Sequence, residues 1–275
     1  MNQINGNITI VLVVYIPDLN FFHKQINLFS NKFKIVIVDL SPQKFKIKEI
    51  IESKKNISII DGLNNGQGYG HNLALRNIHT KYALYVDIDA EIDLVKIKKL
   101  YSYAKKIKNF SILVANTNNK IINKRLAIIE HCDASVMLYN INTIKKYPMF
   151  DEKIFLYFEE KEYFSRLNKT NNKVYIVPKV IVNHHQGTSS NIHLIKNLKN
   201  LQQWHYLWSM FYVYKKMFGY LGGLKKILPL VIVDFLKMLY YILQFKAALV
   251  SRRASRLSGA LLSILGFPSF KRPKF

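Results

Sequence analysis

The sequence has one cysteine, few acidic residues and no long uninterrupted hydrophobic run. Cys132 alone cannot form an intramolecular disulfide, and the N-terminus lacks a charged stretch followed by a long apolar segment and a cleavage site. These absences favour a reducing, cytosolic compartment. The chain has 275 residues, 49% of them hydrophobic, which is enough for one substantial domain with an extension.

Negative charge is especially scarce, because 17 Asp and Glu residues stand against 41 Lys and Arg residues, a formal net charge of +24. Such a charge predicts attraction to a polyanion, such as nucleic acid, anionic lipid or a phosphate-bearing substrate. A solvated, lysine-rich surface accounts for much of the same composition. The charge alone therefore does not select the partner.

The first two thirds of the chain alternate between strand and helix patterns. Residues 8–15 and 33–39 are β-branched runs too short to cross a bilayer, and residues 18–29 carry apolar side chains at helical spacing, which predicts a β-α-β unit. After about residue 191 only basic, aromatic and Leu-rich helical patterns remain. We predict an α/β domain over residues 1–190 and a helical extension over 191–275. Further strands are expected at 56–60, 82–86, 110–114, 127–131, 134–139 and 173–182, and helices near 71–78 and 151–167.

Asp87 and Asp89 follow the strand expected at 82–86. Because side chains alternate along an extended chain, both carboxylates project to the same side, at the edge where open α/β sheets bind ligands. Two hard oxygen ligands suit Mg²⁺ or Mn²⁺ bridging a diphosphate. An Asp-x-Asp pair after a strand is also a common turn or helix-capping pattern, so the pair needs support from its surroundings.

Residues 64–72 (NNGQGYGHN) place three alternating glycines ahead of an expected helix. Glycines let a backbone approach a ligand closely, and the start of a helix exposes amide groups to it. The alternative is a flexible loop. The spacing is not the G-x-G-x-x-G of dinucleotide-binding folds.

A second acidic cluster lies in residues 150–166. At helical spacing Glu162 faces Arg166, which favours a structural ion pair for Glu162. Glu160 has aromatic and leucine neighbours, which would raise the pKa of its carboxyl group toward the range of a general base. An exposed glutamate without a catalytic role fits the same residues.

In their order, these motifs resemble the inverting family 2 glycosyltransferases of the GT-A fold, especially the rhamnosyltransferase-like branch that builds bacterial surface polysaccharides. The resemblance covers about residues 8–190. It implies a Rossmann-like mixed sheet flanked by helices, and transfer of a sugar, with inversion, from a nucleotide-diphosphate sugar to a hydroxyl of a lipid-linked glycan acceptor. The matching segments are 13–18, 37–39, 64–72, 85–89, 150–152, 155–160 and 182–189.

The resemblance also implies a role for individual residues. Asp39 would contact the nucleobase, Asp87 the ribose, diphosphate and metal, and Asp89 the Mg²⁺ or Mn²⁺ ion. Glu160, or alternatively Glu159, would be the base, and His184 or His185 would complete the metal site. The family usually has Asn where Ile16 stands and Asp where Glu160 stands, which leaves donor selection and the choice of base open. Further donor-binding positions are Tyr15, Pro17, Asn64, Gly66, Gly70 and Asn72.

Residues 227–243 are the most hydrophobic stretch of the extension. As a helix they cover only about 25 Å, short of a ~30 Å hydrocarbon core, and they contain Asp234 and Lys237, which can pair at i,i+3. With the arginines and lysines that follow, this layout predicts a peripheral anchor on the anionic inner face of the cell membrane. The alternative is a buried helix pair with a solvated basic tail.

Two rival functions share some of these features. A nucleic-acid-binding protein would explain the basic charge and the aromatic cluster at 204–212, but no nucleic-acid-binding motif or zinc-ligand spacing is present, so we expect no nucleic-acid partner. A sugar nucleotidyltransferase would share the α/β fold and the aspartates. Such enzymes place a glycine-rich basic loop directly after the first strand, where this chain has Val14, Tyr15, Ile16 and Pro17.

Overall fold

The computed structural model describes residues 2–49, 51, 55–120, 125–132, 134–147, 149–185, 187, 190 and 195–274. Gln186, Thr188 and Ser189 of the last matched motif lie outside these residues. The chain divides into two compact units. The sheet unit comprises residues 1–65, 69–150 and 163–191, and the helical unit comprises 66–68, 151–162 and 192–275. The domain boundary expected after residue 190 remains a proposal.

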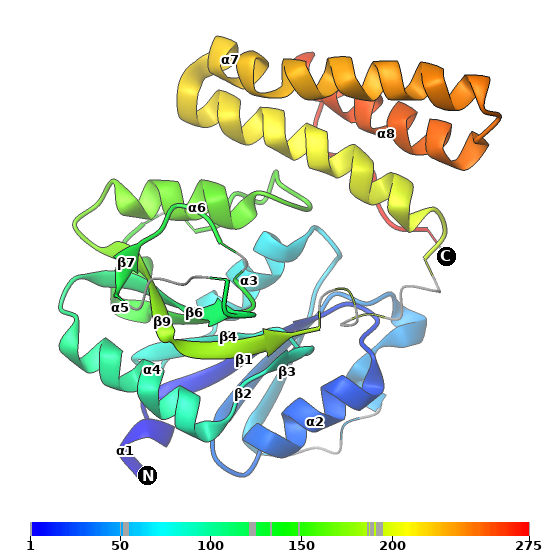
Figure 1. Ribbon diagram of the computed structural model, residues 1–275. Coiled ribbons are helices and arrows are strands. Elements are labelled where there is room, and N and C mark those ends of the chain that lie inside the picture. Colours follow the sequence, from blue (N-terminus) through cyan, green and yellow to red (C-terminus); the bar gives the residue numbers. More distant parts are fainter. Residues whose placement is uncertain are drawn as a thin grey trace. The chain divides into compact units, whose positions relative to one another are not determined.

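A mixed β-sheet forms the centre of the sheet unit (Figure 1). Strands β3, β2, β1 and β4 are parallel, β8 is antiparallel to β4 and β6, and β6 and β9 are parallel. The expected mixed α/β sheet is therefore confirmed. In the described residues the strand order is β3 (Ile57–Asp61), β2 (Lys34–Asp39), β1 (Ile8–Val14), β4 (Tyr82–Val86), β8 (Val136–Asn140), β6 (Phe110–Thr117), β9 (Lys173–His184) and β5 (Ala90–Glu91), with β7 (Ala127–Ile128) paired to β9.

Helices cover both faces of this sheet. On one face, α2 (Leu19–Phe29) and α4 (Leu94–Lys106) contribute Phe22 and Leu100 to a core with alternate residues of β1. On the other, α3 (Gln67–Arg76), α5 (Ile141–Ile144) and α6 (Glu159–Asn168) surround Val11. A strand buried on both faces needs apolar residues at every position, which explains the β-branched run of β1. The remaining short helices are α1 (Asn2–Asn5) and two 3₁₀ turns, Gln43–Phe45 and Ile47–Glu49.

Two expected helices have different boundaries in the structure. The helix expected over 151–167 begins only at Glu159, because Tyr157 and Phe158 have φ angles of 68° and 67°, outside the right-handed helical region. The helix expected from residue 71 begins at Gln67, so two glycines of the 64–72 segment lie in its first turns.

The helical unit consists of α7 (Leu198–Leu243), α8 (Ala247–Ile264) and the segments packed on them. α7 has two arms that meet at Gly219, where φ is 75° and ψ is 174°. A Cβ at Gly259 would lie 2.2 Å from the Trp204 carbonyl oxygen, so the close approach of α8 to α7 requires glycine there. Among the described residues, no helix is both long enough and apolar enough to cross a bilayer.

Candidate metal and nucleotide site

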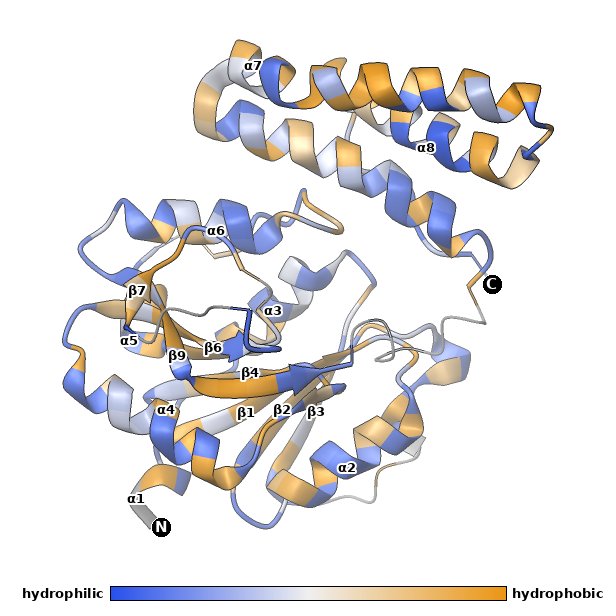
Figure 2. Ribbon diagram, viewed as in Figure 1, coloured by the Kyte–Doolittle hydropathy of each residue, from blue (hydrophilic) through white to orange (hydrophobic). Residues whose placement is uncertain are grey.

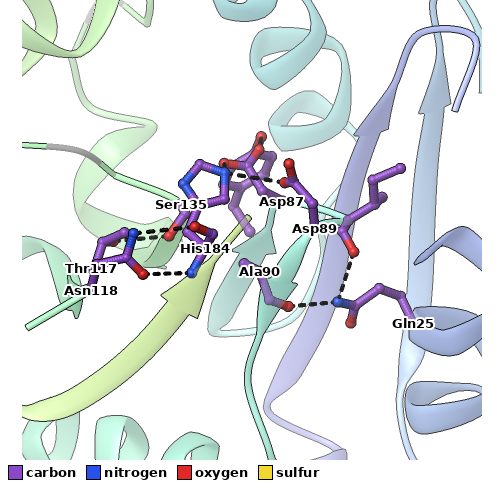
Figure 3. A network of polar contacts seen from close by, with 10 residues as sticks. Gln25, Asp87, Asp89, Ala90, Thr117, Asn118, Ser135 and His184 are labelled. Carbon is purple, nitrogen blue, oxygen red and sulfur yellow. Dashed lines mark hydrogen bonds and ion pairs between the residues drawn. The ribbon is translucent and has the colours of Figure 1, made fainter. Parts of the chain in front are cut away.

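Two carboxylates and one imidazole converge at the carboxyl end of β4 (Figure 3). His184 Nε2, at the end of β9, lies 3.1 Å from Asp89 Oδ1 and 3.6 Å from Asp87 Oδ2. One ligand atom from each residue lies within 4.8 Å of the others. The pairing of Ala90 with His184 between β5 and β9 produces this meeting, because it brings the turn after β4 against the end of β9.

The chemistry of this cluster fits a divalent metal ion. Asp89 is only 1% exposed, and its carboxylate shares a small volume with the Asp87 carboxylate, so a cation there would offset their mutual repulsion. Carboxylate oxygens suit Mg²⁺ and Mn²⁺, and imidazole nitrogen is a common ligand of transition metals. Asp87, Asp89 and His184 are therefore the residues that would hold the ion.

Neighbouring residues fix the orientation of each member of the cluster. The Tyr85 hydroxyl donates a hydrogen bond to Asp87, and Gln25 Nε2 donates to the carbonyls of Ile88 (3.1 Å) and Ala90 (2.7 Å), which holds the turn that carries Asp89. The Asn118 side chain holds the backbone of His184. Its Nδ2 donates to the His184 carbonyl at 3.1 Å, and its Oδ1 accepts from the His184 amide at 2.8 Å. Figure 3 shows the contacts of Gln25 and Asn118 beside the three candidate ligands.

The His185 amide donates to the Asp89 carbonyl at 3.1 Å, but the His185 side chain contacts other residues. Its Nε2 atom lies 3.3 Å from Glu91 Oε1, and its ring lies 5.8 Å from the Phe21 ring. Hydrogen bonds from Lys24 and then His185 lower the pKa of Glu91 to about 2. Successive residues of a strand point to opposite sides, so only one of the two histidines can join the cluster. Of the two histidines that the sequence leaves open, His184 has its ring beside the aspartates, and its role as a metal ligand stays a prediction.

Asp39 lies at the end of β2 and is fully buried. Its Oδ1 accepts a hydrogen bond from the Ser41 amide and its Oδ2 one from the Ile47 amide, both at 2.9 Å. The Ser41 hydroxyl in turn accepts from the Ile16 amide at 2.8 Å. These contacts show that the Asp39 carboxylate holds the 41–47 loop; the nucleobase contact expected for Asp39 stays a prediction.

Tyr15 and Pro17 flank a strained residue at the end of β1. Ile16 has a φ angle of 47°, which is unfavourable for a β-branched side chain. Burial raises the pKa of Tyr15, partly offset by a hydrogen bond with Asn64. Tyr15 and Asn64, both expected to bind the donor, therefore interact directly.

The glycines of the 64–72 segment are explained by packing within the protein. Gly66 has a φ angle of 105°, and a Cβ there would lie 2.3 Å from the Phe155 carbonyl oxygen. A Cβ at Gly70 would lie 2.5 Å from Val13 Cγ1. Asn72 makes two 3.0 Å hydrogen bonds with the backbone of Phe150. The structure thus gives these residues supporting contacts within the protein, and the ligand approach that the glycine pattern suggests stays a prediction.

Glu159 and Glu160 begin α6 and belong to the helical unit. Glu159 is buried, with 6% exposure, whereas Glu160 is partly exposed. The positive φ angles of Tyr157 and Phe158 precede them directly, so the chain enters the helix through two strained residues. Negative charge in the first turn of a helix is favoured by its dipole.

An ion-pair network inside the helical unit holds the segment that carries these glutamates. Lys216 Nζ lies 2.7 Å from Asp151 Oδ2 and 2.6 Å from Glu162 Oε1, and the Tyr212 hydroxyl donates to Asp151 at 2.9 Å. Burial opposes ionisation of Asp151, but its hydrogen bonds, first that from Lys216, keep its pKa below the ordinary value. Glu162 thus forms an ion pair, with Lys216 as a partner, and the pairing expected with Arg166 stays a prediction.

No protein-family model matches the sequence, and no curated protein matches it. Similarity appears among solved structures. A mannosyltransferase from Pyrobaculum calidifontis, PcManGT, solved with GDP-Man and Mn²⁺, superposes with a TM-score of 0.59 at 9% identity, covering 94% of this chain and 87% of that one. Residues 1–349 of S. aureus TarS give 0.55 at 13% identity, covering 94% and 90%.

GalNAc-T7, solved with UDP, GalNAc and Mn²⁺, gives a TM-score of 0.55 at 10% identity over 71% of this chain and 49% of that one. The chain has the GT-A fold. At these identities the likeness establishes the fold alone. It agrees with the mixed sheet of this chain.

Sequence reasoning missed the residues that support the candidate metal site. Tyr85 precedes Asp87 by two residues in the same strand, so the period of the strand already placed both side chains on one side. Gln25 and Asn118 had no such signal, because they reach the site from α2 and from the turn after β6.

Proposed function

We propose that this protein is a metal-dependent glycosyltransferase that moves a sugar from a nucleotide-diphosphate sugar to a hydroxyl group, with inversion at the anomeric carbon. The observation that carries the proposal is the cluster of Asp87, Asp89 and His184 at the carboxyl end of β4 in a GT-A sheet. A bound Mn²⁺ or Mg²⁺ would neutralise charge that develops on the leaving nucleoside diphosphate.

The base that removes the proton from the acceptor hydroxyl is proposed to be Glu160. Its partial exposure supports this choice over Glu159, which is buried, because a base must reach the hydroxyl from which it takes the proton. Proton removal raises the nucleophilicity of the hydroxyl oxygen as it attacks the anomeric carbon. The C–O bond to the diphosphate breaks as the new glycosidic bond forms.

The donor is proposed to lie over the carboxyl ends of β1 and β4. Tyr15, Pro17 and Asn64 would line its nucleotide side, and Asp39, which also holds the 41–47 loop, would contact the nucleobase there. The proposed acceptor is a lipid-linked glycan of the cell envelope, which suits the basic character of the chain after residue 191. The rhamnosyltransferase-like branch of family 2 remains the proposed relationship.

Metal binding provides the direct test, because it can be measured without knowing either substrate. Titration of Mn²⁺ into the protein, followed by the electron paramagnetic resonance of free Mn²⁺, should show one site. Asp89→Asn and His184→Gln should each weaken that site by roughly tenfold or more, or about 1.4 kcal/mol. His185→Gln is the matched control, because this neighbouring histidine contacts Glu91. Equal Mn²⁺ affinity in all four proteins would refute the metal assignment.

The donor can then be found by thermal shift with UDP-, dTDP- and GDP-sugars in the presence of Mn²⁺, because a bound ligand raises the apparent stability. The reaction product separates the two enzyme classes. Release of nucleoside diphosphate supports glycosyl transfer, whereas release of pyrophosphate would favour a sugar nucleotidyltransferase.

A nucleic-acid-binding role has less support than the sequence suggested. Trp204 and Trp208 are buried, with 0% and 2% exposure, and their rings stack on each other at 6.3 Å. They belong to the core of the helical unit and offer no platform for bases.

A further inference from the structure

The second arm of α7 and the facing helix α8 place polar side chains inside and apolar side chains outside. Asp234, 3% exposed, points to α8, where Arg253 Nη1 lies 2.7 Å from Oδ1 and Arg256 Nε lies 2.5 Å from Oδ2. Arg256 also donates to Gln203 at 2.8 Å. The i,i+3 pair with Lys237 expected from the sequence is replaced by this cross-helix network. Lys237 itself is exposed.

The outer side of the same arm is apolar from Leu228 to Leu243, and the exposed Lys225 lies on it nearer the start of the arm. At 100° per residue, eight large apolar side chains fall within about 120° of the helix circumference, and each is between 43% and 78% exposed. In Figure 2 most of this arm is coloured hydrophobic. We call these residues the outer face: Leu221, Leu228, Ile232, Phe235, Leu236, Leu239, Ile242 and Leu243.

An exposed aromatic residue lies in the turn that joins the second arm of α7 to α8. Phe245, in the turn between α7 and α8, is 94% exposed and has a φ angle of 55°. A phenylalanine held almost entirely in water adds to the apolar surface that begins on the outer face. Lys246 follows directly and is also exposed.

Charge decides which partner suits this surface. From residue 195 to residue 275 the sequence has 14 Lys and Arg residues and one acidic residue, Asp234. Because Asp234 is buried between two arginines, the described surface of these residues presents no carboxylate side chain. An apolar face flanked by positive charge alone is complementary to a bilayer with anionic lipids. A second copy would bring the same positive charge, and nucleic acid would leave the outer face in water.

We propose that the outer face and Phe245 insert into the interfacial region of an anionic membrane, with α7 lying in the membrane plane and the exposed lysines at the headgroups. The Asp234 network would keep α8 against the inner side of the arm while the outer face is in lipid. This inference is independent of the proposed transferase activity, since it involves none of the residues assigned to that site.

Binding to vesicles of equal parts phosphatidylcholine and phosphatidylglycerol, measured by sedimentation without donor or metal, tests the inference. The double substitution Ile232→Gln with Leu239→Gln should weaken binding by roughly tenfold or more. Val95→Gln is the matched control, because Val95 is 72% exposed on α4 of the sheet unit, and it should bind as the wild type does. Lys246→Gln with Arg252→Gln should weaken binding roughly 20- to 30-fold, at ~1 kcal/mol per basic residue.

A fluorescence measurement locates the inserted end. Phe245→Trp should show a blue-shifted emission on the same vesicles, whereas the wild-type tryptophans are already buried and should change little. Wild-type affinity in the Ile232→Gln, Leu239→Gln protein, with its unfolding transition intact, would refute the inference. A second result would also refute the inference: the wild type is a dimer, and the double substitution makes it monomeric without changing vesicle binding. A second copy of the chain would then cover the outer face.

Discussion

Lowering the pH should destabilise the protein through a histidine buried beside the candidate metal site. His71 is 1% exposed, and its ring lies 4.2 Å from the ring of Tyr85, the residue that holds Asp87. It stacks on Phe150 at 4.9 Å, and its Nδ1 lies 3.3 Å from the Tyr139 hydroxyl. Its Nε2 is buried without a hydrogen-bond partner among the described residues.

Burial lowers the pKa of His71 to about 3. In the unfolded chain a histidine has a pKa of about 6.5, so between these values the unfolded state binds a proton that the folded state does not. The free energy of unfolding therefore falls as the pH decreases below about 6.5, by up to ~1.4 kcal/mol per pH unit. From about pH 7.5 to about pH 5 the loss due to His71 is about 2 kcal/mol.

Urea unfolding of wild type and His71→Phe at several pH values measures this contribution. The variant loses the contact with Tyr139, which changes its stability by a constant amount, so the comparison uses the difference between the two pH dependences. His205, whose pKa burial lowers to about 4, contributes the same sign in both proteins and cancels. His23→Phe, at an exposed histidine, is the control and should follow the wild-type curve.

Parallel pH dependences for wild type and His71→Phe would refute the reasoning. That result would mean that His71 is protonated in the folded protein as readily as in the unfolded chain.

Two further substitutions test the assignments in the helical unit. Glu160→Gln should lower turnover by roughly 10²- to 10⁴-fold with Mn²⁺ affinity retained, whereas Glu159→Gln should keep most of the activity. Steady-state assays of nucleoside diphosphate release measure both variants, and the reverse order of activities would identify Glu159 as the base. Asp234→Asn should lower the free energy of unfolding by about 3 kcal/mol, because it leaves Arg253 and Arg256 without their counter-charge. Lys237→Ala should change the free energy of unfolding by less than about 0.5 kcal/mol. Equal effects of the two substitutions in urea titrations would contradict the cross-helix network.

Much of the sheet unit could be predicted from residue order. The β-branched runs that became β1 and β2 are buried on both faces, and a strand in that position requires such a run. Asp87 and Asp89 could be placed on one side of the chain because the side-chain period of a strand is two. The helix over 151–167 was predicted too long, because the positive φ angles of Tyr157 and Phe158 have no signature in those residue types.

Periodicity along the chain identified which residues share a face, and composition identified the scarcity of negative charge after residue 191. Both are local properties, so the sequence by itself determined the α/β character of residues 8–182, the acidic pair and the basic helical extension. Tertiary structure decided which distant groups meet. The pairing of β5 with β9 places the His184 ring beside Asp87 and Asp89, the amides of Ser41 and Ile47 donate to Asp39, and Asp234 pairs with arginines of α8 while the apolar side of α7 faces out. These outcomes depend on contacts between residues far apart in the chain, which no repeating pattern within one segment records.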